Sequence, residues 1–107
     1  MTEEFAIGYI IPDRMKELGY GKNYLTPKRR HFSLYAGEVR TIDAYNEYFF
    51  LIDADIEISI HSEFGSYNLN DDTINEQQYE HQGKLILTNS SINLKHIKFI
   101  QVIPTHL

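Results

Sequence analysis

The chain has 107 residues, of which 42% are hydrophobic and 13% aromatic, a composition typical of one globular domain. It contains no cysteine, which excludes a disulfide framework and any zinc or iron–sulfur site built from thiolates. The net charge of −5 argues against non-specific nucleic-acid binding, and no apolar run approaches the ~20 residues that a membrane-spanning helix needs.

The charges are unevenly distributed along the chain. Residues 1–40 hold seven Lys and Arg against five Asp and Glu, giving +2, whereas residues 41–107 hold three against ten, giving −7. A molecule with this asymmetry can stack on copies of itself or on charged neighbours of either sign. The start of the chain is acidic where a secretory signal would be basic, so we expect no Sec-type export.

The N-terminal part predicts one strand and a long loop. Residues 5–11 form an apolar run that is expected to be a strand, ended by Pro12. Residues 13–18 predict one or two helical turns that Gly19 can terminate, too short for a structural helix. Because residues 12–30 are rich in turn residues, we expect a long surface loop, and loops of this length are more often functional or interface-forming than idle.

The centre of the chain gives the strongest strand signal. Residues 48–52 are continuously apolar, which predicts a strand covered on both faces. Ile56, Ile58 and Ile60 alternate with polar residues, which predicts a strand with one solvated face. Residues 53–55 are then expected to form a tight turn between two antiparallel neighbours.

Further short strands are predicted at residues 31–36, 39–43, after a turn at Gly65, at 84–88 and at 97–103. Residues 70–78 are polar and predict a loop or a single helical turn, and residues 89–91 predict a turn. In the last strand the apolar positions shift phase between Phe99 and Ile100, which indicates a β-bulge. Together the pattern predicts an all-β fold: a single antiparallel β-sandwich or jelly-roll-like domain over residues 1–107.

His61 and Glu63, with His81 further along, have the residue types of a non-haem iron site in a jelly roll. However, His61 and Glu63 continue the polar face of the strand that holds Ile58 and Ile60, so we expect them to point to solvent. Asp71, Asp72 and Glu76, or Asp53 and Asp55, could act as paired carboxylates or hold calcium, but turn positions favour Asp for backbone reasons alone. No Gly-x-Ser-x-Gly elbow and no phosphate-binding loop is present. We therefore expect no enzyme, no bound metal and no cofactor.

One patch has the composition of a contact site. It combines aromatic and basic residues, Tyr20, Tyr24, Lys28, Arg29 and Arg30. These residues could meet phosphates of nucleic acid, lipid headgroups at a membrane surface, or an acidic face of another subunit. A protein partner is favoured over specific nucleic acid because the whole molecule is acidic, while the structural alternative is a solvated loop whose charges oppose edge-to-edge aggregation.

Residues 38–104 resemble a family of small bacteriophage virion structural proteins. The resemblance rests on an Arg-x-Ile-x-Ala motif, an aromatic strand, an alternating strand, a glycine turn, a strand that ends in Asn and small polar residues, and a last hydrophobic strand. In this sequence these are residues 40–44, 48–51, 56–60, Gly65, 85–91 and 97–100. The resemblance implies a non-enzymatic β-sandwich in the virion: a vertex or penton, spike or minor capsid component, or a tail or fibre accessory. Such a protein would be assembled in the host bacterial cytoplasm and would contact its own copies and other virion proteins.

Two other functions fit a small sandwich. The chain could be a carbohydrate-binding module that uses exposed residues among its eight tyrosines. A cupin-like metalloenzyme using His61, Glu63 and His81 is the third hypothesis.

Overall fold

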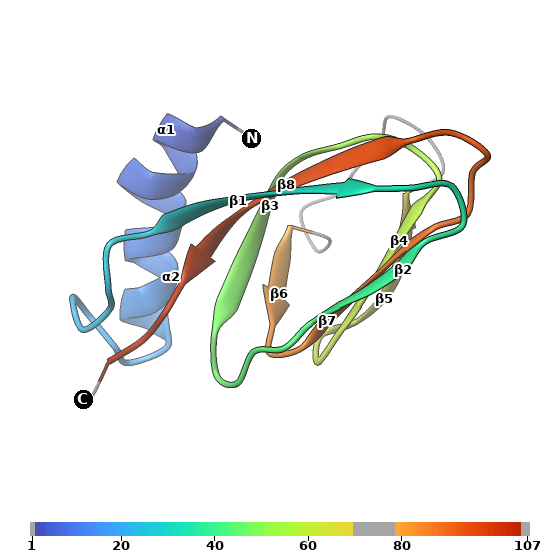
Figure 1. The fold of residues 1–107 in the computed structure, drawn as a ribbon. Helices are drawn as coiled ribbons and strands as arrows, with labels where there is room; N and C mark the ends of the chain where they lie inside the picture. Colours follow the sequence, from blue (N-terminus) through green and yellow to red (C-terminus); the bar gives the residue numbers. More distant parts are fainter. Residues whose placement is uncertain (1, 70–78, 106–107) are drawn as a thin grey trace.

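Two four-stranded antiparallel sheets and one N-terminal helix make up the computed structural model, which describes residues 2–69 and 79–105 (Figure 1). In the first sheet the order is β1 (Lys28–Leu34), β8 (Lys95–Val102), β3 (Tyr48–Ala54) and β6 (Glu80–Gln82). In the second sheet it is β2 (Val39–Ile42), β7 (Leu85–Asn89), β4 (Ile58–Ser62) and β5 (Gly65–Leu69). The predicted all-β sandwich is confirmed.

The strand pairing has the pattern of a jelly roll. β1 pairs with β8, β2 with β7, β3 with β6 and β4 with β5, so the chain forms four nested antiparallel pairs. The additional pairs β3–β8 and β4–β7 join these into two sheets that face each other. A long hairpin rolled up in this way is the jelly-roll arrangement of a double-sheet sandwich.

The main core lies between the two sheets. Alternate residues of each strand point inward, as the two-residue period of a strand requires. The buried members of this core are Phe32, Leu34, Phe49, Leu51, Ile58, Ile60, Leu69, Leu85, Leu87, Ile97 and Phe99.

A second core lies on the other face of the first sheet, where the helix covers it. Tyr48 and Phe50 of β3 and Ile100 and Val102 of β8 point to this face, and the helix contributes Ala6, Ile11 and Met15. The prediction that residues 48–52 form a strand covered on both faces is therefore confirmed for 48–51.

The predicted bulge in the last strand is wrong. Ile97 and Phe99 face the core between the sheets, whereas Ile100 and Val102 face the helix. Since β8 is covered on both faces at this end, apolar residues follow one another without any change of register. The register shift lies instead in β3, between Leu51 and Asp53.

The predicted strand over residues 5–11 is also wrong, because this segment is helical. α1 (Glu3–Phe5), the π-helical stretch η1 (Ala6–Ile10) and α2 (Ile11–Glu17) follow one another without a break and pack beside β1, β8 and β3 (Figure 1). The helix is thus a structural element, longer than the one or two turns predicted after Pro12. No described helix is long and apolar enough to cross a membrane.

Local chemistry explains where the helix begins, widens and ends. The Thr2 hydroxyl accepts a hydrogen bond from the Phe5 N–H (3.2 Å), an N-cap contact. Pro12 cannot donate to the carbonyl of Gly8, and the wider π-helical turns lie just before it. Gly19 has φ +89°, and the N–H groups of Gly19 and Tyr20 bond to the carbonyls of Lys16 and Met15. These contacts form a Schellman cap, so the predicted stop at Gly19 is confirmed.

Two predicted connections differ from the structure. Residues 53–55 do not form a hairpin turn, since Asp53 belongs to β3 and the chain then crosses to β4 in the other sheet. The loop predicted over residues 12–30 is shorter, because α2 reaches Glu17 and β1 begins at Lys28. The predicted loop at 70–78, with Asp71, Asp72 and Glu76, lies outside the described residues.

Candidate docking surface

The segment 18–27 connects the helix to β1 and is fixed to the end of the chain. The Leu25 N–H donates to the carbonyl of Ile103 (2.9 Å), and the Thr105 N–H donates to the carbonyl of Asn23 (2.8 Å). Tyr24 forms an antiparallel bridge with Pro104. These backbone contacts hold the connection in one place beside the helix, so that the side chains it carries form a defined surface.

A hollow of ≈ 790 Å³ lies between α2 and this connection. Pro12, Tyr24, Leu25 and Pro27 provide apolar walls, with Leu25 47% exposed. The polar lining residues are Asp13, Lys16, Lys22 and Thr26, and Gly21 completes the lining. An apolar floor with charged groups at its rim is suited to a side chain or loop of a partner.

The rim of this hollow is basic. Lys16 and Lys22 line it, and Lys28 follows Pro27 in the chain. None of these three lysines forms an ion pair with any residue in the part of the chain that the structure describes. Their charges are available to an acidic partner, with Asp13 as the one acidic group of the lining.

The two tyrosines of the predicted contact patch have different surroundings. Tyr24 is half-buried and lines the hollow. Tyr20 instead packs edge-on against the ring of Tyr48, at 6.3 Å between centroids, and its hydroxyl accepts a hydrogen bond from the Asn46 side chain (3.3 Å). Tyr20 therefore mainly supports the fold beneath the surface.

The three basic residues of the patch lie in β1 and point to alternate faces. Arg29 is on the helix side and forms an ion pair with Glu3 (2.7 Å). Arg30 points the other way, donates to the Gln101 side chain (2.6 Å) and lies over the ring of Phe32 (5.1 Å). Lys28 is exposed. Of the five predicted residues, only Tyr24 is among the residues that line the hollow.

The sequence prediction missed Lys16, Lys22 and Leu25. Lys16 and Pro12 are four residues apart and share one side of the helix, a spacing that a helical prediction would have grouped. Because residues 5–11 are predicted as a strand that Pro12 ends, the helical spacing of Pro12 and Lys16 is not considered in the sequence prediction. Lys22 and Leu25 were included in the long loop but carried no motif of their own.

Below the helix, a polar cluster ties α2 to β3 and β6. Arg14 donates to Glu80 (2.7 Å), and this hydrogen bond raises the pKa of Arg14. Burial, followed by the neighbouring Tyr20 hydroxyl, raises the pKa of Tyr48 to about 12. The Gln82 side chain donates to the Tyr48 hydroxyl (3.3 Å). This cluster fixes the helix on the sheet and so positions the hollow.

A second hollow of ≈ 510 Å³ lies at the turn between β2 and β3. Tyr45 is 92% exposed there, beside the amides of Asn46 and Gln82 and the carboxylate of Glu63. An exposed aromatic ring next to amide and carboxylate groups is able to stack on a flat apolar face and bond to hydroxyl groups.

The structure does not bring together the residues of the alternative iron site, His61, Glu63 and His81. His61 is exposed on β4, where its Nδ1 bonds to the Ser66 hydroxyl (2.5 Å), and Glu63 is exposed in the following turn. His81 is fully buried in β6, with its Nδ1 3.1 Å from the Ser62 hydroxyl and its ring edge-on to Phe99. The expectation that His61 and Glu63 point to solvent is confirmed. Among the residues with described positions, no group of three or more potential ligands could hold a metal ion.

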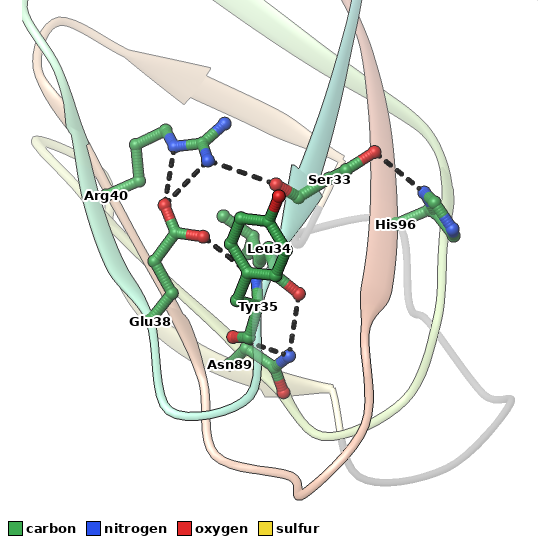
Figure 2. A network of polar contacts seen from close by, with 7 residues as sticks. All are labelled: Ser33, Leu34, Tyr35, Glu38, Arg40, Asn89 and His96. Carbon is green, nitrogen blue, oxygen red and sulfur yellow. Dashed lines mark hydrogen bonds and ion pairs between the residues drawn. The ribbon is translucent and has the colours of Figure 1, made fainter.

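The tip opposite the helix is held by a polar network (Figures 1 and 2). Glu38 accepts two hydrogen bonds from Arg40 and one from the Tyr35 N–H. The bond from the Tyr35 N–H has the largest effect on the Glu38 carboxylate, and together with Arg40 it holds the pKa of Glu38 below its usual range. Arg40 also donates to the carbonyl of Ser33, and the buried Asn89 amide donates to those of Leu34 and Tyr35. The network fixes the turn from β1 to β2 against the end of β7.

Comparison of the chain with protein-family models, curated proteins and solved structures finds no match.

Proposed function

We propose that the chain is a non-enzymatic structural subunit of a bacteriophage virion that acts by self-assembly and by contact with other capsid subunits. Its place would be in the virion, at a vertex, spike or other minor position. The jelly roll supports this proposal because viral capsid domains use that fold. Lectins and cupins use it too, so the choice among these functions depends on the surface.

The observation that carries the proposal is the basic, apolar hollow that the helix and the 18–27 connection add to one end of the jelly roll. Lys16 and Lys22 lie beside its apolar walls, and this arrangement suits an acidic loop or sheet face with an apolar residue at its centre. Residues 41–107 carry −7, so a second copy of this chain offers such acidity, as would another acidic capsid subunit.

Native mass spectrometry of the purified chain tests self-assembly. We expect discrete oligomers that the double substitution Lys16→Glu and Lys22→Glu shifts toward monomer, because the substituted rim repels an acidic neighbour. Leu25→Asp should have the same effect by placing a charge on the apolar wall.

Lys84→Glu is the matched control. Lys84 is exposed and lines the hollow at Tyr45. Its substitution by Glu changes the net charge by as much as each of the two rim substitutions does, but it leaves the basic rim intact. An oligomer that survives the rim substitutions, or one that Lys84→Glu disrupts equally, would contradict docking at this surface.

A carbohydrate-binding module is the second candidate, favoured by the hollow at Tyr45. Titration with oligosaccharides, followed by NMR, should then perturb Tyr45 and fail for Tyr45→Ala, while Tyr35→Ala at the opposite tip retains binding. Absence of any saturable shift would remove this candidate.

A further inference from the structure

Two histidines that are far apart in the sequence meet on the outer face of the first sheet. His31 is on β1 and His96 on β8, and the pairing of these strands places them diagonally across the ladder. His31 Nε2 lies 3.2 Å from His96 Nδ1, with the ring centroids 5.2 Å apart. Both side chains are exposed, so the pair is open to solvent.

We infer that His31 and His96 chelate a divalent transition-metal ion of the zinc, nickel and copper class. Two imidazole nitrogens that bind one ion at 2.0–2.1 Å with a tetrahedral angle lie about 3.3 Å apart. The observed separation of 3.2 Å is close to this value, so little movement of the rings is needed. A metal ion bound by both nitrogens would replace the hydrogen bond between them.

The surroundings hold His96 in place for this role. Its backbone N–H donates to the Asp55 carboxylate (2.7 Å), and its carbonyl accepts from the Asp55 N–H (2.9 Å). The Ser33 hydroxyl lies 3.0 Å from His96 Nδ1, the same nitrogen that would bind the metal, so the hydroxyl has to turn away when the ion binds (Figure 2). A ligand fixed in this way loses little conformational freedom when the metal binds.

The neighbouring charges are mixed. Lys98 stands opposite His31 in the β1–β8 ladder, and Asp53 stands opposite Lys98 in the β3–β8 ladder. Asp53 and Asp55 therefore offset the cationic Lys98 near the bound ion. With two protein ligands, the remaining coordination positions belong to water or to a group of a neighbouring molecule.

The site is independent of the proposed virion role, because it uses neither the hollow nor its rim. It also differs from the His61, Glu63 and His81 set, in which His61 and Glu63 are exposed and His81 is buried.

Titration calorimetry of the whole chain with Zn²⁺, Ni²⁺ and Cu²⁺, in a non-chelating buffer near neutral pH, tests the inference. We expect one equivalent to bind, with Cu²⁺ bound most tightly and Mg²⁺ not bound. His31→Ala and His96→Ala should each weaken binding at least about tenfold, since the remaining imidazole has lost its chelating partner. Binding should weaken in acidic buffer, because protons compete with the metal ion for the imidazole nitrogens.

His61→Ala is the matched control, because His61 is an exposed histidine on the other sheet. His31→Gln keeps a polar side chain at the site and guards against loss of binding through misfolding, which circular dichroism checks in every variant. Equal metal binding by the wild type and the His31→Gln variant, or no binding of Cu²⁺ by the wild type, would overturn the inference.

Discussion

Asn89 is a fully buried amide in the polar network at the tip. Its Nδ2 donates to the carbonyls of Leu34, Tyr35 and Asn93, and its Oδ1 accepts from the N–H and hydroxyl of Ser91. The predicted turn at residues 89–91 explains an Asn here by local backbone preference. The structure shows a second reason for Asn at this position: its side chain links β7 to the end of β1, which is distant in the sequence.

Asn89→Ala should lower the free energy of unfolding by about 3 kcal/mol or more, since several buried carbonyls and the Ser91 groups lose their partner. Urea denaturation measures the loss. Asn68→Ala, which removes an exposed hydrogen bond to Ser59, should change stability by no more than about 0.5 kcal/mol. Similar losses for the two variants would contradict the structural role of Asn89.

Tyr48 makes the free energy of unfolding depend on pH in the alkaline range. Its pKa is raised to about 12 in the folded chain, above the value of about 10 in the unfolded chain. The folded state therefore keeps the proton more firmly, and stability is lost as the pH rises from about 10 to about 12.

Denaturation midpoints at about pH 9 and about pH 11 should differ less in Tyr48→Phe than in the wild type, because the ionisable hydroxyl is gone. Tyr45→Phe, which changes an exposed tyrosine, should behave as the wild type does. If Tyr48→Phe declines as steeply as the wild type, the cause of the alkaline loss lies elsewhere.

At the scale of elements, the strands were predicted better than the helix. The strand at 48–51 was recognised because its residues are apolar without interruption, and the two cores explain why. The helix at 3–17 was missed because Phe5, Ile7 and Tyr9 are exposed on the same run that buries Ala6 and Ile11. Apolar residues on both sides of a helix hide its 3.6-residue period.

Ile11→Ala tests whether this helix is part of the fold. Ile11 is fully buried against the first sheet, so the substitution should cost about 2–5 kcal/mol. Ile7→Ala, at a side chain 37% exposed on the same helix, should cost clearly less. Equal small losses in urea denaturation would mean that the helix does not pack as described.

The residues of both candidate sites are brought together by the tertiary structure, so sequence patterns could not predict that they are neighbours. Lys16 and Leu25 come together only because the helix ends in a Schellman cap that turns the chain back beside it. His31 and His96 meet only through the β1–β8 register, which no local pattern encodes. The predicted contact patch includes Tyr24, which lines the hollow, and also Tyr20 and Arg30, whose side chains bond within the fold.

At the scale of the whole molecule, the helix and the network-held tip lie at opposite ends of a body with extents of 43 × 25 × 21 Å (Figure 1). The basic hollow is at the helix end, and exposed Tyr35, Ile92 and Leu94 belong to the connections at the other. An elongated molecule with two chemically distinct ends could contact a different neighbour at each end.

We propose that the chain works as a part of an assembled particle. The most direct measurement is quantitative mass spectrometry of particles purified by density gradient from cells that produce the chain with its neighbouring genes. The account predicts that the chain co-sediments with the particles in a fixed ratio to the major capsid protein, and that the Lys16→Glu and Lys22→Glu variant is depleted from them. A chain that stays entirely in the particle-free fractions, although particles form, would contradict the account.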